Sequence, residues 1–214
     1  MSPKIQEPRL GGEPRRAETL IQQRNRKIIL RAALDEFSAH GFHGASIANI
    51  ARAAGLSKAN LLYYFSRKEE LYRALLTSLI DTWGVPLTSI DPDGDPREEL
   101  VSYVRRKLQQ TRTMPRESRL LANEILQGGP HLEGETLESL RRIVQSKMDL
   151  IRSWCAEGRI PPVDAPHLLI SVWALTQNYA DYDAQIRRLL GEEADTSDTP
   201  QTFLETLYGR LLTA

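Results

Sequence analysis

The sequence predicts an all-α fold of about nine helices. Beyond residue 26, apolar residues recur at spacings of three and four along most of the chain, which is the period of an amphipathic helix. Breaks rich in Gly and Pro separate these stretches, as in SIDPDGD at 89–95 and QGGP at 127–130. No alternating stretch is long enough to indicate a sheet. Since 41% of the 214 residues are hydrophobic, the chain can bury a substantial core.

Residues 45–65, ASIANIARAAGLSKANLLYYF, predict two short helices joined by a tight turn. Ser46 is a favourable N-cap for the first helix. Gly55 stands where a helix end commonly needs a left-handed residue, and Ser57 can cap a second helix over 58–64. The first helix has one apolar packing face, formed by Ile47, Ile50, Ala51 and Ala54.

This arrangement is typical of a helix-turn-helix, whose second helix presents its N-terminal side chains to the major groove of DNA. The side chains so presented are Lys58, Ala59, Asn60 and Tyr63. Any two short helices of an all-α protein can show the same spacing, so the flanking segments are needed to decide. Upstream, a helix of roughly twenty residues ends at Gly41. Downstream, Ser66 and Glu69 predict a capping box that starts another helix.

In this order, residues 27–71 resemble the DNA-binding domain of the TetR family of one-component regulators. The resemblance implies a flexible arm at 1–26, a helix-turn-helix domain at 27–71 and a ligand-binding and dimerisation domain at 72–214. It assigns phosphate contacts to Ser46 and Lys68. It also assigns contacts with base edges or the DNA backbone to residues at the start of and along the second helix: Ser57, Lys58, Ala59, Asn60, Tyr63 and Tyr64. Many members carry tyrosine where this chain has Leu62, so that phosphate contact should be absent or supplied by Tyr63.

The net charge of zero is the sum of two opposed halves. Residues 1–70 hold 12 Lys and Arg against 7 Asp and Glu, whereas residues 71–214 hold 16 against 21. A basic N-terminal part suits contact with phosphates. The arginines before the first helix could reach a minor groove as an arm or merely belong to a solubilising tail: Arg9, Arg15, Arg16 and Arg24.

Helices are expected over 67–88, 96–113, 115–126, 133–157, 164–190 and 200–212. The helix at 164–190 is apolar on two sides, which implies burial from both. We expect one side of this helix to contact a second copy of the chain. Together with the last helix of each copy it would form a four-helix bundle at the dimer interface. The expected dimer residues are Leu168, Val172, Leu175, Tyr179, Leu204, Leu207, Tyr208 and Leu211.

The segments LLYYFSRKEELYRALL, DTWGVPL and WALTQNYAD resemble the pyrimidine-utilisation regulators of the TetR family, and the similarity extends over about 27–182. This resemblance implies that Trp83, Trp173, Gln177 and Asn178 bind the ligand, with Asn178 at a position where such regulators have histidine. A flat heterocycle stacks on indole, and a carboxamide offers one donor and one acceptor to an imide. The alternative is that the tryptophans are core residues and that Gln177 satisfies a backbone group.

The resulting hypothesis is a DNA-binding repressor that acts as a homodimer on palindromic operator DNA and is released by a small planar effector, uracil or thymine. The alternatives are a TetR regulator of an unrelated metabolite or drug response, and a pyrimidine-binding protein or enzyme that does not bind DNA. An enzyme is disfavoured because no nucleophile with a base, paired carboxylates or phosphate loop can be identified.

No cofactor or metal is expected, because His131 and His167 lack partners at metal-ligand spacing. We expect His131 and Glu124 at the surface. The single cysteine, Cys155, suits a reducing cytoplasm. No apolar run approaches the length of a membrane span, and the polar first 26 residues do not resemble a signal peptide.

Overall fold

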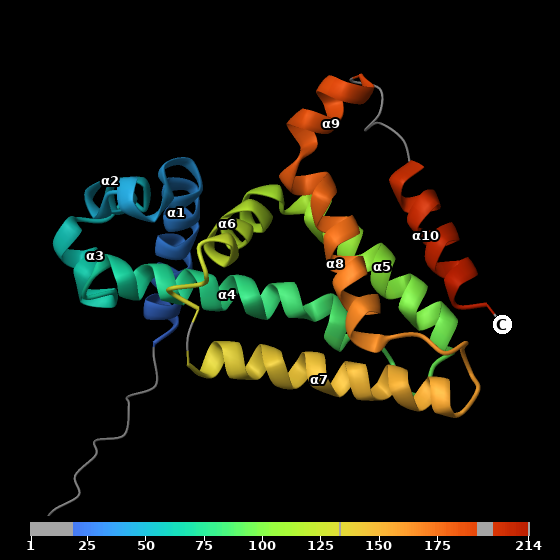
Figure 1. The fold of residues 1–214 in the computed structure, drawn as a ribbon. Helices are drawn as coiled ribbons and strands as arrows, with labels where there is room; N and C mark the ends of the chain where they lie inside the picture. Colours follow the sequence, from blue (N-terminus) through green and yellow to red (C-terminus); the bar gives the residue numbers. More distant parts are fainter. Residues whose placement is uncertain (1–18, 133, 192–198, 214) are drawn as a thin grey trace, which may run out of the picture.

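The computed structural model describes residues 19–132, 134–191 and 199–213, and this part of the chain forms helices and no strands (Figure 1). The helices are α1 (Leu20–Gly44), α2 (Ile47–Ala53), α3 (Lys58–Tyr64), α4 (Lys68–Thr88), α5 (Pro96–Thr113), α6 (Pro115–Leu126), α7 (Glu135–Ala156), α8 (Ala165–Asp181), α9 (Asp183–Leu190) and α10 (Thr199–Leu211). The predicted all-α class is confirmed. None of these helices combines the length and the apolar content needed to cross a bilayer.

Helix α1 begins earlier than the sequence suggested. Thr19 accepts a hydrogen bond from the Gln22 backbone, and the Gln22 side chain accepts one from the Thr19 backbone, which makes a capping box. Residues 20–26 therefore form the first turns of α1 rather than part of an arm, whereas residues 1–18 lie outside the described residues. The regular helix breaks at Gly41, whose φ of 66° is left-handed, as the sequence predicted.

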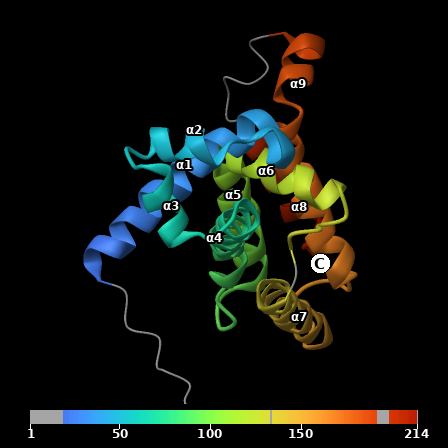
Figure 2. The same ribbon diagram turned by 90° about the vertical axis from the view of Figure 1, so that its left-hand side faces the viewer.

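Two hydrophobic cores lie along the molecule, and α4 runs from the first toward the second (Figures 1 and 2). The first core joins α1, α2, α3 and most of α4 with Leu120 and Leu121 of α6. The second joins α5, α7, α8 and α10 around Tyr103 and Trp154, both of which are fully buried. Since α6 contributes to the core of the helix-turn-helix, a movement of α6 bears directly on α1 and α4.

The single helix expected at 164–190 is wrong, because the chain forms α8 and α9 with a break at Tyr182. Tyr182 leaves helical geometry, with φ −110° and ψ 18°. Helix α9 has no buried residue and projects from the end of α8 away from the second core (Figure 1). Without burial, no packing holds α9 on the axis of α8, and neither Gly nor Pro marks the break in the sequence.

Candidate functional site

The inner face of α3 is anchored in the first core. Leu61 and Phe65 are fully buried, and the Arg26 guanidinium lies 4.5 Å from the centre of the Phe65 ring. The outer face carries the exposed residues Ser57, Lys58, Ala59, Asn60 and Tyr63. The Tyr63 side chain is 73% exposed. This exposed face holds one positive charge and several hydrogen-bonding groups, which suits contact with a nucleic acid.

The turn before α3 has the geometry that the sequence predicted. Gly55 has φ 69°, and the Leu56 backbone NH donates to the Ala51 carbonyl at 2.9 Å, which closes the end of α2. The Ser57 hydroxyl accepts a hydrogen bond from the Asn60 backbone at 3.1 Å. Both roles were readable from the sequence because they depend only on residues close in the chain.

Ser46 precedes α2, but its hydroxyl makes no capping hydrogen bond. Instead the Ser46 backbone NH donates to Glu36 Oε1 at 2.9 Å, and Asn49 Nδ2 donates to the same oxygen at 3.1 Å. The backbone hydrogen bond from Ser46 holds the pKa of the Glu36 carboxyl below its usual value. Ser46 is therefore the N-cap residue of α2 by position, but its hydroxyl does not cap the helix, and Glu36 of α1 instead holds the Ser46 backbone and the Asn49 side chain.

Two expected DNA contacts, Tyr64 and Lys68, make hydrogen bonds within the domain. The Tyr64 hydroxyl accepts from Asn25 Nδ2 at 2.9 Å. Lys68 Nζ donates to the carbonyls of His43 and Ala45, each at 3.2 Å. Tyr64 therefore fastens α3 to α1, and Lys68 fastens the start of α4 to the turn before α2.

The capping box expected from Ser66 and Glu69 is not formed, because the N-cap residue of α4 is Arg67 and no side chain caps the helix. Ser66 Oγ donates to Glu70 Oε2 at 2.7 Å, and the Ser66 backbone NH donates to the same oxygen at 2.9 Å. These hydrogen bonds lower the pKa of the Glu70 carboxyl. The helix begins one residue later than expected, after Arg67. Glu70, and not Glu69, is therefore the third helical residue and the acid that Ser66 contacts.

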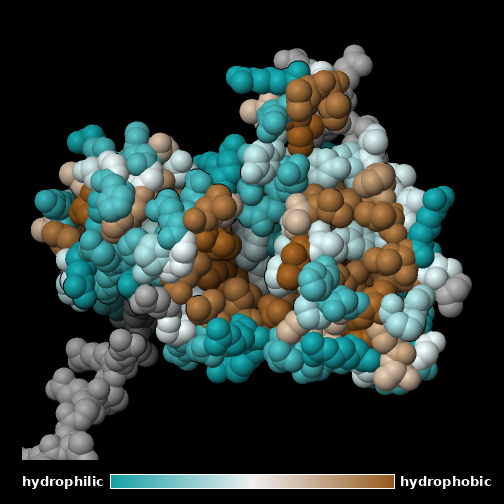
Figure 3. All heavy atoms as spheres, in the orientation of Figure 1, coloured by the Kyte–Doolittle hydropathy of each residue, from teal (hydrophilic) through white to brown (hydrophobic). Residues whose placement is uncertain are grey.

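A cavity of about 200 Å³ lies between the two cores. Five helices line it, and the lining residues are Ile80, Trp83, Gly84, Leu87, Tyr103, Lys107, Leu121, Ile125, Leu140, Val144, Trp173 and Gln177. We call it the aromatic cavity. Hydrophobic residues surround a hollow over α4, α6 and α8 on the face that Figure 3 shows. Drug-sized ligands occupy cavities of about 300–1,000 Å³, so this volume suits a smaller molecule, such as a single substituted ring.

Three of the four expected ligand residues, Trp83, Trp173 and Gln177, meet in this cavity. Trp173 Nε1 donates to the Tyr103 hydroxyl at 2.7 Å, and burial raises the pKa of that hydroxyl, which therefore stays protonated. Near Gln177, the Ser118 hydroxyl donates to Asp181 Oδ1 at 3.3 Å, and burial raises the pKa of the Asp181 carboxyl. The expectation for Asn178 is not met, because this residue is exposed and does not line the cavity.

Lys107 belongs to a run of three basic residues, 105–107, and such a run is usually a solvated face, so this run did not indicate a buried position. The Lys107 side chain lines the aromatic cavity and is 3% exposed. Its Nζ lies 4.2 Å from the centre of the Trp83 ring and donates to Gln110 Oε1 at 3.1 Å. Burial lowers its pKa to about 7. A partial signal was available, since Lys107 lies four residues after Tyr103 and therefore on the same face of α5.

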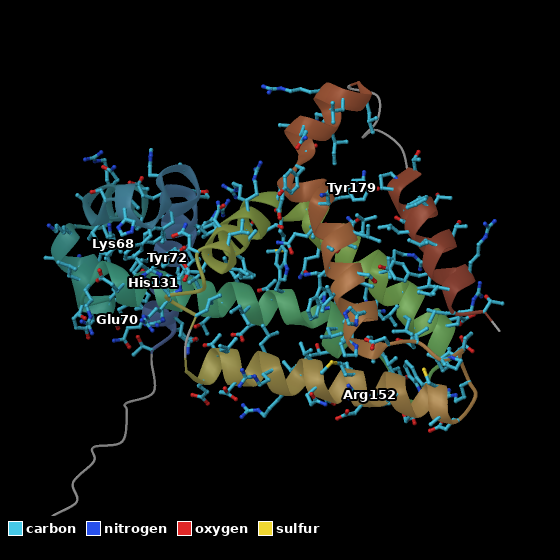
Figure 4. All side chains as sticks on the ribbon, in the orientation of Figure 1. Lys68, Glu70, Tyr72, His131, Arg152 and Tyr179 are labelled. Atoms are coloured by element: carbon cyan, nitrogen blue, oxygen red, sulfur yellow. The ribbon has the colours of Figure 1, made fainter. Side chains whose placement is uncertain are left out.

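A buried polar cluster joins α6 to the helix-turn-helix, contrary to the surface positions expected for His131 and Glu124. Glu124 is buried and accepts a hydrogen bond from the His131 backbone at 2.7 Å, with His131 Nδ1 at 3.2 Å from the same carboxylate oxygen. Burial and the charge of the neighbouring Glu124 carboxylate raise the pKa of the Tyr72 hydroxyl of α4. The His131 ring packs on Tyr72 and Phe42, and Figure 4 shows His131, Tyr72 and Lys68 close together.

The residues expected at a dimer seam differ in how far the chain itself buries them. Four are buried in the chain's own second core: Leu168, Val172, Leu204 and Tyr208. Tyr179 is half-buried. The exposed ones are Leu175, Leu207 and Leu211, and the exposed apolar residues Ile170 and Phe203 extend the same surface. Figure 3 shows hydrophobic side chains over α8 and α10. Spacing alone could not tell which face of each helix the chain covers by itself.

Comparisons with known proteins place both parts of the chain in one family. Residues 29–75 match the family model for bacterial regulatory proteins of the tetR family. Residues 76–212 match the model for the C-terminal region of YcdC-like proteins within that family. Over 166 residues the chain is 43% identical to the HTH-type transcriptional regulator RutR of Escherichia coli K12, and the match covers 78% of each chain.

Solved structures share the fold. The putative transcriptional regulator SCO4942 of Streptomyces coelicolor has a TM-score of 0.72 with 24% identity, covering 88% of this chain and 98% of its own. The structure of AibR in complex with isovaleryl coenzyme A and operator DNA has a TM-score of 0.64 with 22% identity over the same shares of the two chains. The relatives are regulators of transcription and not enzymes. The chain therefore belongs to the TetR family of transcriptional regulators.

Proposed function

We propose that the protein is a one-component repressor that binds palindromic operator DNA as a homodimer and is released by uracil or thymine. Its site of action would be the cytoplasm, where both the DNA and such metabolites are found. The observation that carries this proposal is the convergence of Trp83, Trp173 and Gln177 on one small cavity from two separate helices. Similarity to RutR over most of the chain supports the same class of effector.

The chemistry of the aromatic cavity suits a flat imide. Indole rings from α4 and α8 offer stacking surfaces. The Gln177 amide lines the cavity, and its oxygen can accept an imide NH while its NH₂ group can donate to a ring carbonyl. The Tyr103 hydroxyl accepts from Trp173 and can still donate its proton to a ligand carbonyl.

Helix α4 and helix α6 would carry the response to the DNA-binding face. Helix α4 holds Trp83 in the cavity at one end, and Lys68 bonds to the turn before α2 at the other. Helix α6 lines the cavity with Leu121 and Ile125, and Glu124 between them accepts a hydrogen bond from the His131 backbone and neighbours Tyr72 of α4. A ligand that favours one placement of these helices changes the distance between the two recognition helices of a dimer. That distance must be about 34–36 Å to read adjacent major grooves.

The test is fluorescence anisotropy of the purified protein on DNA from upstream of its own gene, at fixed salt, with and without uracil or thymine. We expect specific binding that either base releases. Specific binding that neither base changes would reject the pyrimidine effector, and absence of specific binding would reject this operator.

Two variants separate the sites. Tyr63→Ala removes an exposed side chain of α3 and should abolish operator binding while ligand binding and dimerisation persist. Tyr182→Ala, which truncates another exposed tyrosine, is the matched control and should bind operator normally. Gln177→Met keeps the side-chain length without the amide and should weaken uracil binding while operator binding in the absence of ligand persists.

A further inference from the structure

Among the described residues that line the aromatic cavity, Lys107 alone carries a charge. The polar partners that hold its ammonium group are neutral. Lys107 Nζ donates to Gln110 Oε1 at 3.1 Å and faces the Trp83 ring at 4.2 Å. Gln110 in turn donates to the Thr82 carbonyl of α4 at 2.8 Å, which keeps the amide oxygen directed at the lysine.

No carboxylate of the described chain forms an ion pair with Lys107, and burial is the single cause of its lowered pKa. A buried ammonium group without a counter-charge is costly, because the protein interior solvates it far less well than water. Of its three NH donors, Gln110 takes one. A ligand that brings a negative charge or a strong oxygen acceptor would supply what the protein does not.

We infer that Lys107 binds the oxygen-bearing edge of the effector, so that the aromatic cavity selects small planar rings with anionic or acceptor-rich oxygen edges and rejects planar cations. The inference rests on the effector role proposed above for this cavity. The Lys107 ammonium lies over the Trp83 ring at the wall of the cavity, and a charge-assisted hydrogen bond from Nζ to a ligand oxygen makes the contact. Lys107 is thus a specificity-determining residue, and through Gln110 and Thr82 it ties ligand recognition to α4.

The test measures ligand affinity of the full-length protein by calorimetry, with tryptophan fluorescence as a second readout. The probes are uracil and two planar rings of matched shape and opposite charge, benzoate and benzamidine. We expect the unmodified protein to prefer benzoate to benzamidine at least tenfold. Lys107→Met should erase this preference and lower uracil affinity about 10- to 100-fold, the range for a hydrogen bond to a charged group.

Lys147→Met is the matched control. Lys147 is half-buried and donates to the Ile90 carbonyl at 2.8 Å, but it does not line the cavity. This variant should bind all three probes as the unmodified protein does. Lys107→Gln, which keeps polarity without charge, should also lose the benzoate preference and serves as a second variant if the methionine variant fails to fold.

The outcomes separate the inference from the proposed function. Equal binding of benzoate and benzamidine to the unmodified protein, or unchanged uracil and benzoate affinities in both Lys107 variants, would overturn the role of Lys107 while a uracil response stands. Benzoate binding that depends on Lys107 in a protein that does not bind uracil would support the inference and reject the pyrimidine effector. A protein that binds none of the three probes would overturn both.

Discussion

Replacing Lys107 with methionine is expected to stabilise the ligand-free protein at pH 7. Methionine has a similar shape and no charge, so it fills the same space beside Trp83 without the cost of a buried ammonium group. Burial lowers the pKa of Lys107 from 10.5 to about 7. Since a tenfold change in proton affinity corresponds to about 1.4 kcal/mol, this difference amounts to on the order of 4 kcal/mol at pH 7.

The substitution also removes favourable contacts, which reduces the expected gain. The hydrogen bond to Gln110 contributes about 1 kcal/mol, and the contact with the Trp83 ring contributes about 1 kcal/mol or more. We therefore expect the free energy of unfolding to rise by roughly 2 kcal/mol at pH 7. The variant should retain its helical content and bind operator DNA.

The pH dependence gives this prediction its sharpest form. Lys107 has a lower pKa in the folded chain than in the unfolded chain, so the unfolded state binds more protons between pH 7 and 10.5. Its destabilising effect is therefore full below pH 7 and fades as the pH rises toward 10.5. The advantage of Lys107→Met should shrink between pH 7 and pH 9.5.

The assay is urea unfolding of both proteins at the same protein concentration, followed by circular dichroism from pH 6 to pH 9.5. Equal concentrations are needed because the apparent stability of the proposed dimer depends on protein concentration. A methionine variant that is less stable than the unmodified protein at pH 7 would refute the reasoning. So would an advantage that does not change with pH.

Three further predictions concern the exposed face of α3, the cluster formed by Glu124 and His131, and the proposed dimer surface. Lys58→Ala should reduce the slope of log affinity for operator against log salt by roughly 0.9 per protomer, and an unchanged slope would remove Lys58 from the phosphate contacts. Glu124→Leu leaves the backbone NH of His131 unpaired and should lower the free energy of unfolding by about 1–3 kcal/mol; urea unfolding that shows a gain would contradict the structural role. Leu207→Glu should yield monomers in sedimentation velocity, whereas Leu137→Glu, at 39% exposure against 40% for Leu207, should stay dimeric; a dimeric Leu207 variant would exclude this surface.

The helix-turn-helix could be predicted because its signals are local. The Ser57 hydroxyl caps α3 by accepting the backbone NH three residues later, and Gly55 takes the left-handed conformation that ends α2. The exposed face of α3 could also be predicted from residues close in the chain, since the apolar Leu61 and Phe65 determine which face is buried. The family resemblance predicted four ligand residues, and three of the four line one cavity.

The aromatic cavity and its lining depended on tertiary structure. Helical periodicity tells which residues share a face, but it does not tell which of two apolar faces the chain covers by itself. That choice buries Leu168 and Leu204 and exposes Leu207. For the same reason, the cluster of Glu124 and His131 and the burial of Lys107 could not be predicted from the sequence.

What the sequence determined by itself is the set of structures that rest on neighbouring residues: the Ser57 cap of α3, the turn at Gly55 and the exposed face of α3. Only the tertiary structure decided which distant side chains meet, because burial depends on how helices far apart in the chain pack together. Lys107 reads as solvated among basic neighbours, yet it is 3% exposed once α4 packs beside α5. The break at Tyr182 also depends on tertiary structure. It lies where the helix no longer packs on the second core, and no helix-breaking residue marks it in the sequence.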